Sequence, residues 1–374
     1  MKKNFNGGVM GFEIDFIGIP EETKDADAIA LRWEDQGKTT TIGIYDGGNQ
    51  KYGEALGAFL DDYFLTASKK NIDFVVCSHS DMDHSSGLKH ILENYEVKKL
   101  YMNRPWLYVR ELFPYVNDGR ITEKSLENQL RESYSYISDL EEIATKKGID
   151  ICEAFEGTSV SDKMVILSPS KEFYIDLLKE SQKTPLTEDS SRSRESLFSR
   201  VKQYIKSLIE SWTTEYLRDD VVTSAENEMS VVCLGGDYDE KNYFLLTGDA
   251  GIRALSNAIS LTEEKGFSIK NKVNFLQIPH HGGRHNVSSS LLNKLIGCIV
   301  QEGSIPTKTA FCSVGKNSDH PLQMVENAFI RRGVKVYKTN GGIICHHVGI
   351  QFNRVGWGPA IQEDFSSNVE EWEN

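Results

Sequence analysis

Cys77-Ser78-His79-Ser80-Asp81-Met82-Asp83-His84 is the stretch that decides the fold of this 374-residue chain. It follows the apolar run Phe74-Val75-Val76, which predicts a buried strand, and it precedes residues 85–92, which predict the start of a helix. Four side chains that can bind metal therefore lie in one strand-to-helix loop. Such loops often carry function, because the scaffold holds them rigidly while their side chains stay free.

The imidazole and carboxylate groups of this loop are ligands of first-row divalent metals. Alternation along an extended loop turns His79, Asp81 and Asp83 to the same side, and the adjacent His84 can then face a second metal. The alternative is a polar turn in which Asp83 or Ser85 caps the helix. Four ligand-type residues within six positions favour metal binding over the cap.

Three further predicted strands end in polar side chains of the same kinds. The apolar segments 243–246, 274–278 and 309–314 lead to Asp249, to His280-His281 and to His320. In layered α/β folds, ligands bind outside one shared edge of a sheet, where such strand ends converge. We therefore expect these residues to form one site with the loop at 77–84.

The composition is that of an ordinary globular chain, with 39% hydrophobic and 26% charged residues. Its net charge of −13 gives no general attraction to nucleic acid, so nucleic-acid binding would need a local basic groove. The N-terminal residues lack the apolar core of a signal peptide, and no stretch is long enough to span a bilayer. The six cysteines are scattered without a Cys-x-x-Cys pair, which predicts buried free thiols and a cytoplasmic location.

The sequence predicts a discontinuous main domain interrupted by a helical insertion. The main domain comprises residues 1–104 and 226–360, the insertion comprises 105–225, and an acidic tail of 361–374 is expected to be frayed. The segments 334–337 and 342–345 predict a closing hairpin around Asn340-Gly341.

The predicted insertion contains two amphipathic helical patterns, over 126–143 and 198–212, and a short strand at 164–167. A protein partner is a candidate occupant of its surface. Its second half also carries a group of basic residues, which form either a solvated helix face, the more usual outcome, or a contact for a polyanion. These residues are Arg192, Arg194, Arg200, Lys202 and Lys206.

The order of these motifs resembles the metallo-β-lactamase superfamily, and in particular its ComEC-type hydrolase domain. The signature His-x-His-x-Asp-His of the superfamily has Asp81 here in place of its second histidine. The other matching pieces follow in order along most of the chain outside the insertion. They are Asp46-Gly47-Gly48, 227–230, 246–249, His280-His281-Gly282-Gly283, 313–315 and His320-Pro321. The resemblance implies an α/β fold, an αββα sandwich with a dinuclear metal site at one sheet edge.

Carried over to this sequence, the resemblance implies two divalent metal ions, zinc or manganese. His79 and Asp81 would bind the first metal, and Asp249 would bridge both. Asp83, His84 and one of His280 and His281 would bind the second, with His281 preferred because it adjoins the glycine. Asp46 and Asn227 are additional candidates, Asn227 standing near the position where most relatives have a further histidine. The first site is therefore expected to be labile or filled only with substrate, with an oxygen-rich ligand set that favours Mn²⁺ or Mg²⁺.

The chemistry expected of such a site is hydrolysis. Two ions lower the pKa of a bound water and clamp a displacement at phosphorus, with the bridging hydroxide as nucleophile. Asp83, His280 and His320 are the candidate catalytic residues. His320 would contact phosphoryl oxygens or protonate the leaving oxygen, or it caps a helix that starts at Pro321.

The leading hypothesis is a phosphodiesterase or nuclease. An ester, lactone or β-lactam hydrolase on the same metals is the alternative within enzymes, because one fold hosts all these activities. A degenerate site in a protein that acts through partner binding is the alternative outside them. The absent histidine favours that alternative, and the presence of Asp83, His84, Asp249 and His281 opposes it.

Overall fold

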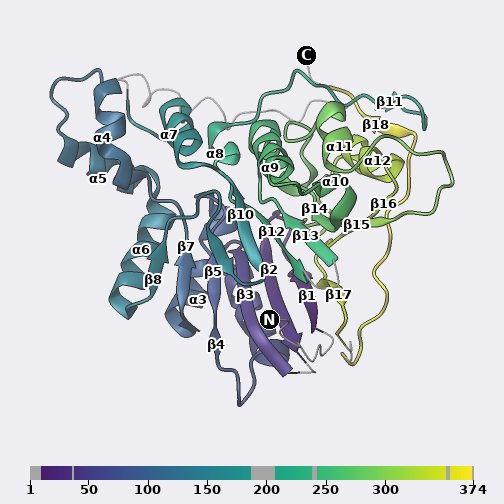
Figure 1. The fold of residues 1–374 in the computed structure, drawn as a ribbon, viewed down its shortest axis with the longest axis horizontal. Helices are drawn as coiled ribbons and strands as arrows, with labels where there is room; N and C mark the ends of the chain where they lie inside the picture. Colours follow the sequence, from purple (N-terminus) through teal and green to yellow (C-terminus); the bar gives the residue numbers. More distant parts are fainter. Residues whose placement is uncertain (1–9, 36–37, 187–206, 238–241, 351–353, 373–374) are drawn as a thin grey trace, which may run out of the picture.

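Two seven-stranded mixed sheets form the centre of the protein (Figure 1). The structure is a computed structural model that describes residues 10–35, 38–186, 207–237, 242–350 and 354–372. In order across the first sheet, the strands are β17 (Ile344–Val348), β1 (Met10–Phe16), β2 (Ala28–Asp35), β3 (Lys38–Gly47), β5 (Phe74–Val76), β7 (Lys99–Tyr101) and β8 (Asp150–Cys152). In order across the second sheet, they are β16 (Val334–Lys338), β15 (Lys308–Cys312), β14 (Val273–Gln277), β13 (Asn242–Leu246), β12 (Val232–Asp237), β10 (Met164–Ser168) and β9 (Ser159–Ser161).

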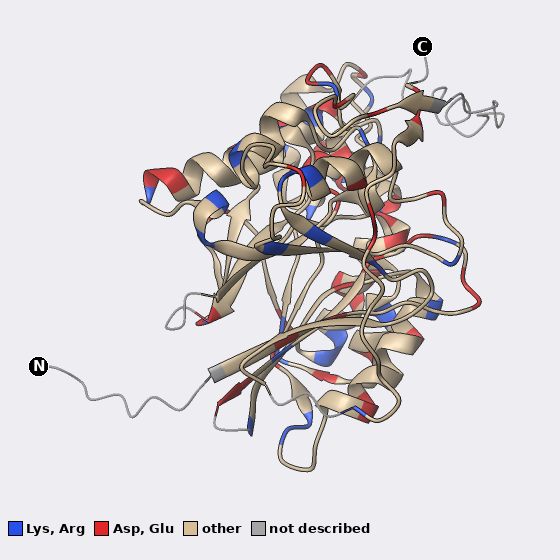
Figure 2. Cartoon of the chain, turned by 90° about the vertical axis from the view of Figure 1, so that its right-hand side faces the viewer, with Lys and Arg blue, Asp and Glu red and all other residues tan. Residues whose placement is uncertain are grey.

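Three apolar cores hold the layers together. An aromatic-rich core between the sheets includes Phe16, Phe244, Phe275 and Phe311, all buried. The other two cores lie on the outer faces of the sheets, where helices cover them. Figure 2 shows the sheets between these outer helical layers. The expected αββα sandwich is therefore confirmed, because each sheet buries one face on the other sheet and one face on helices.

The helices that cover each sheet come mostly from the same part of the sequence as the strands of that sheet. On the first sheet lie α1 (Gln50–Phe59), α3 (Leu88–Asn94), α5 (Glu123–Ser133), α6 (Ser135–Lys147) and α7 (Lys171–Glu180). On the second lie α9 (Ile252–Glu264), α10 (Ile269–Lys272), α11 (Ser289–Leu295) and α12 (Gln323–Arg331). Short elements connect them: η1 (Leu60–Phe64), β4 (Asn71–Ile72), α2 (Met82–Ser85), β6 (Glu96–Val97), η2 (Pro105–Tyr108), α4 (Val109–Leu112), η3 (Phe113–Tyr115), α8 (Ala225–Glu228) and η6 (His280–Gly282).

The parallel parts of both sheets position the site. Strands β3, β5, β7 and β8 are parallel neighbours in the first sheet, and β13 to β16 are parallel neighbours in the second. Parallel strands end at the same edge of their sheet, so the loops after β3, β5, β13, β14 and β15 meet. The Ser78 carbonyl accepts a hydrogen bond from the Val231 amide at 2.9 Å, which joins the two sheets at this edge.

The segment predicted as a helical insertion contributes both helices and strands of the two main sheets. Helices do occupy most of 105–147, and Thr122 begins α5 with a capping box. The strands at 150–152, 159–161 and 164–168, however, extend the two main sheets. The proposed domain boundaries thus cut across the sandwich, and they stay a prediction.

Three local predictions are wrong. Strands β16 and β17 do not form a hairpin, because β16 pairs with β15 in the second sheet while β17 pairs with β1 in the first. The helix expected over 198–212 lies outside the described residues up to 206, and 207–209 form strand β11. The tail is not frayed over 368–370, because β18 (Asn368–Glu370) pairs with β11 and buries Val369.

The cysteines agree only in part with the prediction of buried free thiols. Within the described residues, no disulfide links the six cysteines, of which Cys77, Cys233 and Cys312 are buried and Cys298 is exposed. No helix in that part of the chain is both long enough and apolar enough to cross a membrane. Figure 2 shows acidic and basic residues interspersed over the outer helices and loops.

Candidate metal centre

The loop after β5 turns into α2 without using its carboxylates as caps. Asp81 holds the N-cap position of α2, but its side chain makes no capping hydrogen bond. Ser85 instead donates its hydroxyl to the Asp81 carbonyl at 2.7 Å. The helix-cap interpretation of this loop is therefore wrong, and the carboxylates of Asp81 and Asp83 are available for other contacts.

Four buried side chains from four separate segments form what we call the inner site: Asp27, His84, Asp249 and His281. One ligand atom from each lies within 4.8 Å of the others. The His84 Nε2 atom is 3.1 Å from Asp249 Oδ1, and the His84 ring centroid is 5.5 Å from that of His281. Imidazole nitrogen with carboxylate oxygen is a donor set for zinc, manganese or iron.

Hydrogen bonds on the outer ring nitrogens orient the histidines. Asp46 Oδ2 accepts from His84 Nδ1 at 2.8 Å, and the Ser313 carbonyl accepts from His281 Nδ1 at 2.8 Å. A carboxylate or carbonyl can only accept, so each ring carries its proton on Nδ1 when neutral. The lone pair on Nε2 then points into the inner site, as in most protein metal sites.

Several buried polar atoms at this point have no hydrogen-bond partner among the described residues. They are Nε2 of His79, His84 and His281, Oδ1 of Asp249 and Oδ1 of Asp27. Buried polar atoms are rarely left unpaired, because each costs about 1–3 kcal/mol. Their convergence on one point is explained if a cation completes them, so the residues present fit a divalent metal ion.

The electrostatics of the inner site favour a cation. Burial lowers the pKa of the His84 imidazole, but the carboxylates of Asp249 and Asp46 outweigh burial and hold that pKa well above its ordinary value. Burial also lowers the pKa of His281, but the carboxylates of Asp83, Asp27 and Asp249 outweigh it and raise that pKa to about 10. A proton on each of these imidazole rings therefore offsets the negative charge of the nearby carboxylates. A bound metal ion would displace these protons and take over that role.

The second group of predicted ligands forms a more open arrangement, the outer site: His79, Asp81, Asn227 and His280. The His79 Nε2 atom lies 3.7 Å from Asp249 Oδ2 and 3.8 Å from Asp81 Oδ2. His280 directs Nδ1 at Asp249 Oδ2, and the Asn227 amide is 3.1 Å from the same nitrogen. The Asp81 and His280 side chains are 31% and 37% exposed, whereas His79 is buried. Asp249 thus faces both sites with one oxygen each.

An ion pair occupies part of the outer site. Lys183, from the segment after α7, contacts Asp81 Oδ1 with its ammonium group. Its Nζ atom also lies 3.5 Å from the Ser80 hydroxyl. The resemblance implied Asp81 as a ligand of the first metal, and this contact leaves only its second oxygen turned toward His79.

Asp83 and His320 lie on the other flank of the inner site. The Asp83 Oδ2 atom is 3.4 Å from His281 Nε2. His320 directs Nδ1 to Asp25 Oδ2 at 2.8 Å, and Asp25 also accepts from the Gly315 amide at 2.8 Å. Helix α12 begins after the N-cap residue Leu322 without a side-chain cap, so the capping role considered for His320 is wrong.

Backbone strain is concentrated at this edge. Asp46, His280 and His281 have φ values of 58°, 50° and 52°, a region that residues other than glycine seldom adopt. Gly282 follows with φ 82°, and a Cβ atom there would lie 2.1 Å from the Cβ of Pro321. Such strain persists only where the surroundings enforce it, which is common at functional sites.

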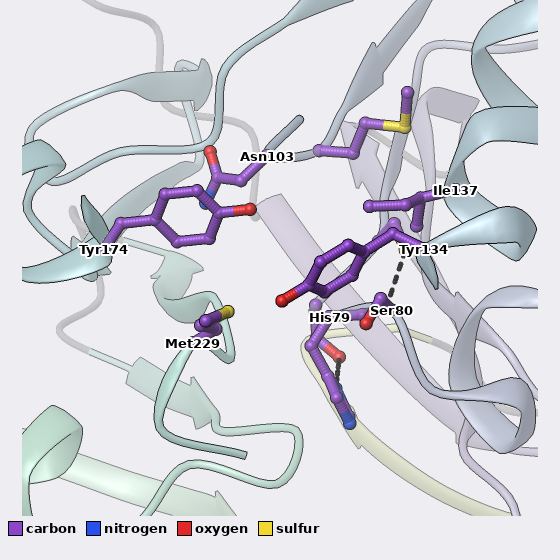
Figure 3. Close-up of a pocket in the computed structure, with 10 residues that line it drawn as sticks. His79, Ser80, Asn103, Tyr134, Ile137, Tyr174 and Met229 are labelled. Atoms are coloured by element: carbon purple, nitrogen blue, oxygen red, sulfur yellow. Dashed lines mark hydrogen bonds between the residues drawn. The ribbon is translucent and has the colours of Figure 1, made fainter. Parts of the chain in front are cut away.

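A small cavity of about 10 Å³ adjoins the loop that carries His79, enough for about one water molecule. Tyr134 and Tyr174 extend into it beside Met229 (Figure 3). The Tyr134 hydroxyl lies 2.9 Å from Ser181 Oγ and 3.1 Å from Thr184 Oγ1. These bonds tie the segment that carries Lys183 to the side of the site.

A further acidic group, Glu13, Asp15 and Cys345, lies elsewhere in the first sheet. Arg354 binds Asp15 at 2.6 Å and Glu13 at 3.0 Å, and Arg32 binds Glu13 at 2.6 Å. Guanidinium groups thus pair with both carboxylates, although Oε2 of Glu13 is buried without a hydrogen-bond partner among the described residues. We interpret the cluster as a structural ion-pair network.

Comparisons with known proteins give structural likeness only. No protein-family model matches the sequence, and no curated protein matches it either. The chain is similar to rubredoxin oxygen:oxidoreductase from the anaerobe Desulfovibrio gigas, at 12% identity and a TM-score of 0.28 over 66% of this chain and 40% of that chain. It is also similar to an archaeal metallo-β-lactamase superfamily protein from Sulfolobus tokodaii, at 13% identity and a TM-score of 0.27 over 90% of this chain and 81% of that chain.

The structure brings the predicted residues together at one edge of the sandwich, but some of them lie in the buried inner site and others in the more exposed outer site. Asp46 contacts the Ser78 amide at 2.7 Å as well as the His84 ring, so it orients a candidate ligand. The sequence prediction missed Asp25, Asp27 and Lys183. The pair Asp25-x-Asp27 directly before a predicted strand was a usable signal, whereas nothing in the sequence near Lys183 connects it with the loop at 77–84.

Proposed function

We propose that this protein is a divalent-metal-dependent hydrolase of the metallo-β-lactamase superfamily. The observation that carries the proposal is the convergence of the unpartnered Nε2 atoms of His79 and His84 on Asp249, with His281 in the same buried cluster. A site that had lost its ligands would not keep the hydrogen bonds that aim His84 and His281. A protein acting only through partner binding is therefore the weaker alternative.

We propose two metal positions. His84, His281, Asp27 and Asp249, with Asp83 beside them, would hold the inner ion. His79, Asp81, Asp249 and His280 would hold the outer ion, and manganese or zinc suits this mixture of nitrogen and oxygen. When bound, such ions act as Lewis acids that lower the pKa of a water molecule and stabilise charge that develops on the substrate.

Phosphodiesters are the proposed substrates, with nucleic acid as one candidate. The ComEC-type motif order supports this choice. His320 is suited to contact a phosphoryl oxygen or to protonate the leaving oxygen, because Asp25 fixes its Nδ1 proton and leaves Nε2 for the substrate. The basic residues considered for a polyanion, at 192–206, lie outside the described residues. We also propose that the helices of 105–147 can bind a protein partner. A cytoplasmic location is a further proposal.

A hydrolysis screen tests the proposed function. The purified chain is stripped with chelator, reloaded with Mn²⁺, Zn²⁺ or Mg²⁺, and assayed on single-stranded DNA, duplex DNA, RNA, cyclic nucleotides and bis(p-nitrophenyl) phosphate. Ester, lactone and β-lactam substrates run in parallel. We expect metal-dependent cleavage of at least one phosphodiester, and none by the His84→Ala variant. Cleavage restricted to esters, lactones or β-lactams would replace the proposed substrate class, and no metal binding at all would refute the function.

A further inference from the structure

Lys183 is the candidate that the proposed function leaves unexplained. Its ammonium group pairs with Asp81, a residue that the resemblance assigns to a metal. Its side chain is only 35% exposed, although lysines are usually solvated. It also comes from a segment more than one hundred residues away from the loop that it contacts, as the separation of 102 positions shows.

The segment that carries Lys183 is anchored on both sides of it. The buried Ser181 hydroxyl donates to Glu226 Oε1 at 2.6 Å, and the buried Thr184 hydroxyl lies 3.1 Å from the Tyr134 hydroxyl. The Lys183 amide itself donates to Ser181 Oγ at 3.1 Å. The ammonium group lies 5.9 Å from the centre of the Tyr134 ring. These contacts hold the lysine over the outer site.

The two carboxylate oxygens of Asp81 have different neighbours because of this contact. Lys183 takes Oδ1, while Oδ2 stays 3.8 Å from His79 Nε2, the buried atom that lacks a partner. A cation placed between Oδ2 and His79 would therefore bind a carboxylate already neutralised by Lys183. It would also lie close to a second positive charge, which repels it.

The two sites differ in this respect. The inner site has Asp27, Asp46 and Asp249 around its histidines, and no lysine or arginine ion pair is formed by any of these three carboxylates among the described residues. The outer site, in contrast, contains the ammonium group of Lys183, which forms an ion pair with Asp81. The weakness expected for the outer site from its missing histidine is thus increased by a positive group built into it.

We propose that Lys183 is a resident cation of the outer site, which competes with a divalent ion for Asp81. The inference rests on the proposed metal centre and specifies its occupancy. The chain then binds one divalent ion tightly, at the inner site, and a second one weakly. Lys183 is a positioning residue in this account, because it acts through Asp81.

Calorimetric titration of the chelator-stripped protein with Mn²⁺ tests the proposal. In the wild type we expect one tight binding event and one weaker event. Lys183→Met removes the charge but keeps an unbranched apolar stem against Tyr134. It should tighten the weaker event by at least about tenfold, the usual size for neighbours of metal ligands. Lys183→Arg keeps the charge and should behave as the wild type does.

A matched control and a double variant complete the test. Lys179→Met removes a lysine on α7 that pairs with Asp176, so it should leave both events unchanged. Adding Asp81→Asn to Lys183→Met should abolish the gain. Two equally tight events in the wild type, or no change in Lys183→Met, would overturn the proposal and leave the proposed function standing. No binding of Mn²⁺ or of Zn²⁺ by any variant would refute both.

Discussion

The inner and outer sites share Asp249 but differ in how their ligands are held. The inner ligands His84 and His281 are buried and fixed through Nδ1 by Asp46 and Ser313. In the outer site, Asp81 and His280 are each about one-third exposed, and Lys183 holds one oxygen of Asp81. Residues that match one sequence motif therefore need not bind a metal ion equally strongly, because the surrounding charges and hydrogen bonds set the affinity at each site.

Asp249→Ala should have the largest effect, because Asp249 offers Oδ1 to the inner site and Oδ2 to the outer site. We expect loss of both metal-binding events and a fall in hydrolysis of about a thousandfold. Calorimetry and initial rates under saturating Mn²⁺ measure the two effects. Asp176→Ala, which removes an exposed carboxylate paired with Lys179, is the control. Full metal content in Asp249→Ala would show that the two sites do not share this residue.

His84→Ala should cost more activity than Asp81→Ala. His84 belongs to the buried site, while Asp81 belongs to the site that Lys183 already neutralises. We expect the rates of the two variants to differ by at least about tenfold, as for ligands of unequal importance. Side-by-side kinetics in saturating Mn²⁺ decide the order. The reverse order would contradict the distinction drawn between the sites.

Asp46→Asn tests orientation separately from ligation. The amide keeps the shape of the carboxylate, but it weakens the bond to His84 Nδ1 and presents a donor near Ser78. Metal affinity of the inner site should fall by about ten- to a hundredfold, with the outer event unchanged. Titration with Mn²⁺ resolves the two events. Equal losses at both sites would mean that the substitution disturbs the whole edge of the sheet.

Asp81→His should have the smallest effect on rate and should change metal preference. Imidazole replaces a hard oxygen ligand and cannot hold the Lys183 ammonium group as a carboxylate does. We expect the outer site to shift toward Zn²⁺. Competition of Zn²⁺ against Mn²⁺ followed by elemental analysis measures the ratio. An unchanged ratio would show that position 81 does not contact the metal.

The resemblance to the metallo-β-lactamase superfamily implied the sandwich, and local patterns in the sequence predicted the edge that carries the site. Buried strands appear as apolar runs, and the residues after them, such as Asp249 and His281, carry the polar chemistry. The supposed hairpin at 334–345 failed because its two strands join different sheets, a choice that depends on partners far away in the sequence. The tail prediction failed for the same reason, since β18 needs β11 as its partner.

The site was predictable only where its residues follow strands. Asp27 precedes a strand and reaches the inner site because β2 and β3 lie side by side, so its role comes from the sheet order. Lys183 reaches Asp81 because Ser181 and Thr184 are anchored by Glu226 and Tyr134. Those contacts join distant segments, and no spacing in the sequence encodes them.

Anomalous diffraction from crystals of the wild-type protein grown with a small excess of Mn²⁺ shows whether the inner site binds the metal in preference to the outer site. We expect a strong anomalous peak within bonding distance of His84 Nε2, His281 Nε2 and Asp249 Oδ1, and a weaker peak or none beside His79 and Asp81. A stronger peak at the outer site, or no peak between the three inner atoms, would contradict it.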